Sequence, residues 1–303
     1  MKGKRQASRG GITIETVYMM SSHSASVVVF ATLLWYYTSS SNSVCSQQIL
    51  YTDCVGHNQA HQMRGGDRGG ECLDQTIVGT SLVLSCLELF MGSFAAICLR
   101  QRFPQSSEME SFWAPGALHA AGTLFTNLGF ALGGASLVQM VKLLEPIETL
   151  ILTTAVKLLS AGVLDLSLDV LSSVLMIVVG TFFLLGGRIQ GDAFPWPSAY
   201  CALASGACMT IRNVTLKNRP TSLPKKRHIE LDQFWLGVKT FERLSMSGAV
   251  VSSVSTILFF IAGGKASYTQ FTPRLLVQAV SFFSAYQISV SLFARQIHIH
   301  HRF

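Results

Sequence analysis

The chain has 303 residues, of which 49% are hydrophobic and 13% are charged, about half the charged share of a soluble domain. Together with a mean hydropathy of +0.40, this composition excludes a disordered protein, a disulfide-framed secreted module and an ordinary cytosolic enzyme. The net charge of +7 suggests nucleic acid, but the Lys and Arg residues lie between long apolar blocks. We therefore predict an all-α, polytopic membrane helix bundle.

Eight apolar blocks are long enough to cross a bilayer, which takes about 20 residues per helix. They cover residues 24–41, 75–99, 115–134, 135–159, 170–187, 197–217, 234–263 and 273–294. The first block is short and rich in serine, and we expect it to extend upstream to residue 17. With a cytosolic N-terminus, most Lys and Arg residues between the blocks fall on the cytosolic side. Both termini are therefore expected in the cytosol.

Two linking segments differ from the apolar blocks. Residues 53–72 are polar and rich in glycine, and they read as a loop on the non-cytosolic side. Cys45, Cys54 and Cys72 lie in or near it, and one disulfide and free thiols are equally compatible with the pattern. Residues 219–231 hold a basic cluster, which favours a cytosolic anchor over a site for anionic lipid.

Ionisable residues inside the apolar blocks are costly and mark candidate sites. Lys142 and Glu145 are spaced i, i+3, so they share a helical face, and Pro146 predicts a kink there. This pattern favours an anion site at Lys142 over a purely structural salt bridge. The planar fork of Arg212 suits a phosphate or carboxylate, with an interfacial arginine as the equal alternative. Glu88 is assigned no role.

Polar residues also dot the block 115–134, and they could line a cavity or bond their own backbone. They are His119, Thr123, Thr126 and Asn127. Gly129 and Gly133 form a small-residue face suited to close helix packing. The chain has no phosphate-binding loop of the ATPase type and no hydrolase motif, so we expect neither an ATP-driven pump nor an enzyme. The histidines near residue 300 fit chance composition better than a metal site, and no metal or cofactor is expected.

Residues 117–152 (ALHAAGTLFTNLGFALGGASLVQMVKLLEPIETLIL) resemble the signature of triose-phosphate translocator-like transporters, members of the drug/metabolite transporter superfamily. That signature is a His, then Thr-Asn, then small residues with a Ser, then Lys-x-x-Glu-Pro. The matching residues are His119, Thr126, Asn127, Ser136, Lys142, Glu145 and Pro146. Arg212-Asn213 with Lys217 resembles the family's sixth helix, and residues 282–295 with Tyr286 resemble the eighth. Residues 33–50 resemble the first helix, although Gln47-Gln48 replaces a basic dipeptide.

The resemblance implies ten helices in two inverted five-helix halves that exchange phosphorylated sugars or triose phosphates for inorganic phosphate. It implies phosphate contact by Thr126, Lys142 and Arg212, and substrate contact by Tyr286. The implied supporting residues are His119, Thr123, Asn127, Glu145, Pro146 and Lys217. Thr123 stands where some members have a second His, which suggests a different organic moiety or weaker recognition.

The expected organisation follows from this comparison. Residues 1–16 form a cytosolic tail, 17–190 the first five-helix repeat, 191–295 a partial second repeat of three helices, and 296–303 an atypical tail. We expect a C-terminally truncated form, because the chain ends before the family's ninth helix and its Lys-Arg pair.

The expected function is secondary antiport of a phosphorylated sugar or triose phosphate against inorganic phosphate. A nucleotide-sugar transporter and a transport-inactive truncated membrane protein are the alternatives. The expected partners are the phosphorylated substrate, inorganic phosphate and membrane lipid, with no nucleic acid, and a homodimer stays open. The expected location is a multi-pass position in the Golgi or endoplasmic reticulum, with the plastid envelope as the alternative.

Overall fold

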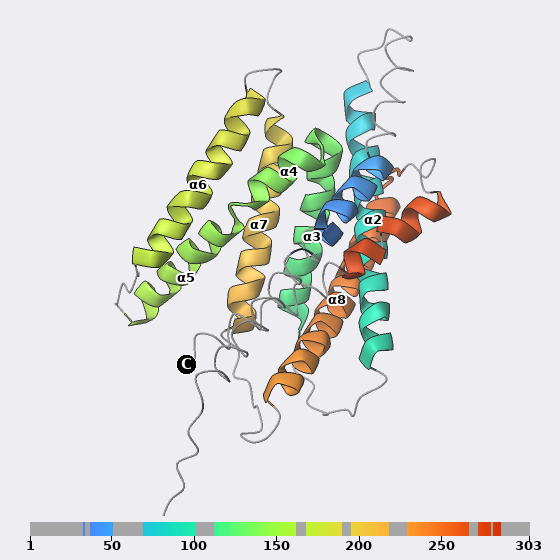
Figure 1. The fold of residues 1–303 in the computed structure, drawn as a ribbon. Helices are drawn as coiled ribbons and strands as arrows, with labels where there is room; N and C mark the ends of the chain where they lie inside the picture. The colour runs from blue at the N-terminus through green and yellow to red at the C-terminus, as the bar shows by residue number, and fades with distance from the viewer. Residues whose placement is uncertain are drawn as a thin grey trace, which may run out of the picture.

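The computed structural model describes residues 33, 37–50, 69–100, 112–161, 168–189, 195–217, 229–266, 272–279 and 281–285. Within these ranges the secondary structure is helical and contains no strand (Figure 1). The labelled helices are α2 (Gly69–Arg100), α3 (Trp113–Gly133), α4 (Ala135–Lys142), α5 (Glu145–Ala161), α6 (Leu168–Ile189), α7 (Trp196–Lys217) and α8 (Ile229–Ile261). Residues 37–50, 273–279 and 281–285 are also helical. The predicted all-α helical architecture is therefore confirmed.

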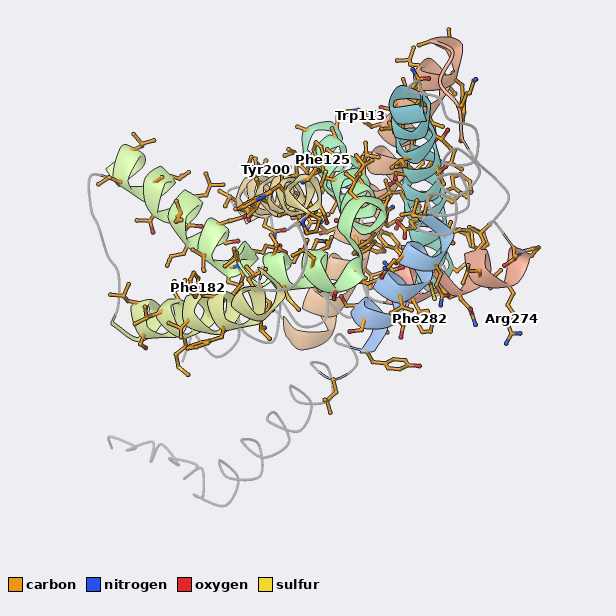
Figure 2. The ribbon with its side chains drawn as sticks, turned by 90° about the horizontal axis from the view of Figure 1, so that it is seen from above. Trp113, Phe125, Phe182, Tyr200, Arg274 and Phe282 are labelled. Carbon is orange, nitrogen blue, oxygen red and sulfur yellow. The ribbon has the colours of Figure 1, made fainter. Side chains whose placement is uncertain are left out.

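The bundle is built around two antiparallel helix pairs, α3 with α7 and α2 with α8. The α3 helix also packs on α2 and α8, so it lies at the centre, while α5 packs on α7 and α6 makes its main contact with α4. Figures 1 and 2 show α5 and α6 on the opposite side of α7 from α2. The central position of α3 brings its polar residues against α2 and α7 at once.

Small residues allow α3 and α7 to approach closely. The Ser198 hydroxyl donates to the Gly129 carbonyl at 2.8 Å, and Ser205 donates to the Gly122 carbonyl at 2.8 Å. A Cβ atom added at Gly133 would overlap the Ser198 side chain. The predicted packing role of Gly129 and Gly133 is thus confirmed, and serine hydroxyls on the facing helix complete the contact.

The block 135–159, expected as one kinked helix, consists of two helices. The α4 helix ends at Lys142, Leu143 and Leu144 form a turn, and α5 begins at Glu145. Pro146 has no backbone N–H to bond the Lys142 carbonyl, so the helical ladder cannot run through this point. The kink predicted from Pro146 therefore takes the form of a complete break just before it.

A glycine separates α3 from α4. Gly134 has φ +86°, a conformation that other residues rarely adopt. The chain turns there, and the N–H of Ala135 at the start of α4 donates to Oε1 of Gln47 at 3.0 Å. A basic side chain at position 47 could not accept this hydrogen bond. Gln47 therefore caps α4.

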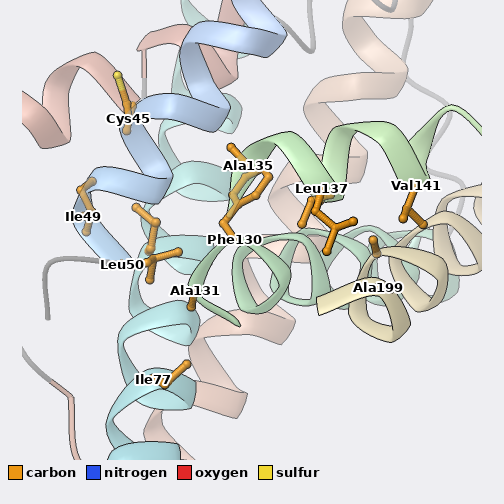
Figure 3. Close-up of a cluster of buried hydrophobic side chains, with 14 residues drawn as sticks. Cys45, Ile49, Leu50, Ile77, Phe130, Ala131, Ala135, Leu137, Val141 and Ala199 are labelled. Carbon is orange, nitrogen blue, oxygen red and sulfur yellow. The ribbon is translucent and has the colours of Figure 1, made fainter. Parts of the chain in front are cut away.

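One apolar core lies where residues 37–50 meet α2, α3 and α4 (Figure 3). Ile49, Leu50, Leu84, Phe130 and Leu137 are almost completely buried in it. A smaller cluster around Leu89, Ala120, Ala249 and Phe283 joins α2, α3 and α8 to residues 281–285. These clusters surround the polar residues of α2 and α3 and hold them in place.

By length and composition, two helical stretches could cross a membrane, namely Gln75–Cys98 and Val238–Ile261, and Val174–Gly186 is a shorter apolar stretch. The two longer stretches coincide with the expected spans 75–99 and 234–263. The other expected spans, the topology and the division into repeats stay predictions. Residues 1–32, most of the loop 53–72, the basic cluster at 225–227 and the histidines near residue 300 lie outside the described residues.

Candidate polar site at the centre of the bundle

A buried arginine–histidine pair joins α7 to α3. Nη1 of Arg212, which is 9% exposed, lies 2.8 Å from Nδ1 of the fully buried His119. A guanidinium can only donate, so Nδ1 accepts and a neutral imidazole carries its proton on Nε2. That nitrogen is buried and has no hydrogen-bond partner. Oδ1 of Asn213 accepts from Nε of Arg212 at 3.1 Å and from Nη2 at 2.8 Å, which orients the guanidinium.

A buried carboxylate lies between the helix of residues 37–50, α2 and α3. Glu88 on α2 is 1% exposed. Its Oε1 accepts from the Ser46 hydroxyl at 3.2 Å, and its Oε2 accepts from Nδ2 of Asn127 at 3.0 Å. The same Nδ2 donates to Ser85 at 2.9 Å. The three helices are therefore joined through one carboxylate, and Asn127 is the residue that ties α3 to it.

Lys142, the last residue of α4, links the two polar groups through its charge. Its ammonium interacts electrostatically with Glu88 and Glu145 and with the His119–Arg212 pair. The alternative that the sequence left open, a structural salt bridge between Lys142 and Glu145, is not found in the described part of the chain. Since α4 ends at Lys142 and α5 begins at Glu145, the two residues do not share one continuous helical face.

The threonines of α3 are engaged within the protein. The Thr126 hydroxyl lies 2.8 Å from the Gly122 carbonyl and 2.7 Å from the Ser205 hydroxyl, inside the α3–α7 interface. The Thr123 hydroxyl donates to the carbonyl of His119, one turn earlier, at 2.9 Å. In this structure Thr126 therefore lies two turns along α3 from the His119–Arg212 pair. A phosphate contact by Thr126 stays a prediction.

The first turn of α5 contributes a carboxylate that sequence reasoning missed. Oε2 of Glu148 is buried without a hydrogen-bond partner, against Gly206 of α7. Glu145 and Glu148 interact electrostatically, and the Thr149 and Thr210 hydroxyls are 3.2 Å apart one residue further along α5. The spacing of Glu145 and Glu148 in the sequence was the available signal.

Of the remaining predicted site residues, the structure describes Pro146 fully, the backbone of Lys217, and not Tyr286. Pro146 lies exposed in the first turn of α5, next to the break that follows Lys142. Lys217 is the last residue of α7, and its side chain lies outside the described residues. Tyr286 also lies outside them. The structure therefore brings together His119 and Arg212, with the charge of Lys142 acting on both, whereas Asn127 belongs to the Glu88 group two turns further along α3.

The donor set of this centre suits an anion better than a metal. The parts of the chain that the structure describes hold no group of three or more His, Cys, Asp or Glu residues able to hold a metal ion. Arg212, Lys142 and the free N–H of His119 all offer donors or positive charge. No family model, no curated protein sequence and no solved structure matches the chain. The transporter resemblance therefore rests on the sequence motifs alone.

Proposed function

We propose that the chain is a membrane-embedded helix bundle that binds a phosphorylated sugar or triose phosphate and exchanges it for inorganic phosphate. The observation that carries this proposal is the His119–Arg212 pair. It is buried at the centre of the bundle, with the charge of Lys142 acting on it. Location in the Golgi or endoplasmic reticulum remains part of the proposal.

The exposed apolar surface supports a position in lipid. Large side chains of α5 and α6 lie outside the packed helices, including Leu159 at 88%, Met176 at 77% and Phe183 at 77% exposure. Soluble monomers rarely expose contiguous apolar patches of this kind. The acyl chains of a bilayer would cover these side chains at no cost in polar contacts.

The chemistry of the buried pair supports phosphate as the ligand. Burying a guanidinium among apolar helices is costly, so a buried arginine marks a candidate functional site. His119 and Asn213 are neutral partners that orient the fork of Arg212. Nε2 of His119 is a buried donor that lacks an acceptor. A phosphate oxygen would supply that acceptor next to the guanidinium of Arg212.

Phosphate counter-exchange in reconstituted liposomes tests this function. We expect uptake of labelled phosphate that depends on internal phosphate and is lost in Lys142→Ala. Lys265→Ala removes an exposed lysine in the turn after α8 and serves as the matched control, with exchange unchanged. No uptake by folded wild-type protein would overturn antiport and favour a transport-inactive protein. Competition by nucleotide sugars but not by sugar phosphates would favour the nucleotide-sugar alternative.

A further inference from the structure

Glu88 is a buried titratable group that the proposed exchange does not use. Five elements pack around this part of α2, and one of them is the segment 281–285, whose uncharged Phe283 packs with Leu89. The helix of residues 37–50 contributes Asn42 and Ser46, α3 contributes Asn127, and α4 contributes Lys142. The α8 helix places only uncharged groups beside this part of α2, with Gly248 against Leu89 and Ser253 against Cys86. Among these neighbours, Lys142 alone carries a charge that acts on Glu88.

The neighbours of Glu88 suit both of its protonation states. Ser46 and Asn127 donate hydrogen bonds to the two oxygens, as a carboxylate requires. The side-chain amide of Asn42 also lies close enough to interact with the carboxyl group. The Ser46 hydroxyl can also accept, so it can bond the O–H of a protonated Glu88.

Burial is the feature that points to a proton. Glu88 is almost completely buried, and the hydrogen bonds to its oxygens come from the neutral side chains of Ser46 and Asn127. An ionised carboxyl buried among neutral partners is costly, so burial stabilises the protonated form.

Lys142 connects this proton to the anion site. While Glu88 is ionised, it attracts the Lys142 ammonium and competes with an incoming phosphate. Once Glu88 is neutral, the full charge of Lys142 is available to the phosphate. A proton on Glu88 and an anion at Lys142 therefore favour one another, and by linkage the effect is reciprocal.

We propose that Glu88 is a proton-binding site coupled to the anion site, so that phosphate binding is accompanied by uptake of one proton from water onto the Glu88 carboxylate. The proton is released again to water when the phosphate leaves. This inference rests on the proposed function for the anion, whereas the proton site itself can be observed without any anion.

The test uses full-length wild-type protein and Glu88→Gln in lipid nanodiscs, since Gln mimics the protonated acid in shape and hydrogen bonding. Glu242→Gln is the matched control, because Glu242 is also buried, at 5% exposure, but lies on α8. Infrared difference spectra between acid and alkaline buffer are recorded first, without phosphate. The phosphate Kd is then measured across the same pH range.

We expect a buried-carboxyl band that appears on acidification in the wild type and in Glu242→Gln, and that is missing in Glu88→Gln. The ratio of wild-type to Glu88→Gln phosphate affinity should fall by up to about tenfold per pH unit as Glu88 ionises. Titration of phosphate itself cancels in this ratio.

Two outcomes would overturn the inference. If the wild type shows no such band, Glu88 is not a proton-binding site, and this conclusion does not depend on phosphate binding. If the band is present but the ratio of wild-type to Glu88→Gln phosphate affinity does not change with pH, the proton site and the anion site are not coupled. Failure of every variant to bind phosphate at any pH overturns the proposed function instead, and the infrared result then decides the proton site alone.

Discussion

At the scale of single residues, a substitution of Asn127 gives a direct test of stability. Its Nδ2 serves both Ser85 and Glu88 in a fully buried setting. Asn127→Ala leaves a buried carboxylate with one donor fewer, so we expect the free energy of unfolding to fall by about 1–3 kcal/mol. Denaturant unfolding of the purified protein in detergent, followed by circular dichroism, measures this.

The control for Asn127→Ala is Thr215→Val. Among the described residues the Thr215 hydroxyl bonds its own helix, at the Ile211 carbonyl, so its removal should change the stability by less than about 0.5 kcal/mol. Equal stability of Asn127→Ala and the wild type would mean that the Glu88 network contributes nothing to the fold.

Arg212 gives the residue-scale prediction for binding. Arg212→Lys keeps the positive charge, but an ammonium cannot hold the Nε and Nη2 bonds to Asn213 together with the bond to His119. We expect phosphate affinity to fall by about tenfold or more. Isothermal titration with inorganic phosphate measures the change. An unaltered affinity would show that Arg212 contributes charge alone.

The sequence identified individual polar residues well and their partners poorly. Lys142 and Arg212 stood out because ionisable groups are rare in apolar blocks, and His119 stood out as a polar residue of the transporter-like motif. Their arrangement depends on contacts between residues far apart in the chain, which no local pattern encodes. Glu88 received no role for this reason, since Ser46 and Asn127 reach it from two other helices.

At the scale of helices, we expect alanine to change the free energy of unfolding in opposite directions at two glycines. A Cβ at Gly116 would lie 2.7 Å from Cβ of Ser247 and 3.0 Å from the backbone nitrogen of Gly248, so α3 and α8 would have to separate. Gly116→Ala should lower the free energy of unfolding by about 1–3 kcal/mol. The measurement is the same detergent unfolding.

Gly180 on α6 supplies the matched control. Nothing lies within 4 Å of a Cβ added there, so Gly180→Ala should stabilise the protein by about 0.5–1 kcal/mol through helix propensity. If both alanines had the same effect, the close α3–α8 contact would not be present in the folded protein.

Helix existence was predictable and helix ends were not. The apolar blocks predicted helices in each described region, because hydrophobic content over 20 residues is a strong local signal. Pro146 predicted an interruption of the helix, but the turn between α4 and α5 lies at Leu143 and Leu144, just before the proline. The cap on α4 escaped prediction entirely, since Gln47 lies far from Ala135 in the chain.

At the scale of the whole molecule, the distribution of apolar side chains is uneven. The helices α2, α3 and α8 bury residues against one another, whereas α6 exposes apolar side chains around most of its circumference. Buried Thr181 is an exception among the described residues of α6. An added charge on such a helix is costly in lipid and favourable in water. The amount of folded protein recovered after adding a charge therefore distinguishes the two environments.

Phe183, 77% exposed on α6, is the position for that test. In a bilayer, Phe183→Arg places a charge among acyl chains at a cost of about 2.5–3.5 kcal/mol, so the folded chain recovered from membranes should fall several-fold. Phe183→Leu keeps the side chain apolar and should leave recovery unchanged. In water the sign reverses, because arginine would mask an exposed apolar surface. Folded Phe183→Arg protein recovered in the soluble fraction would therefore refute a lipid-facing α6, and with it the membrane-embedded bundle proposed here.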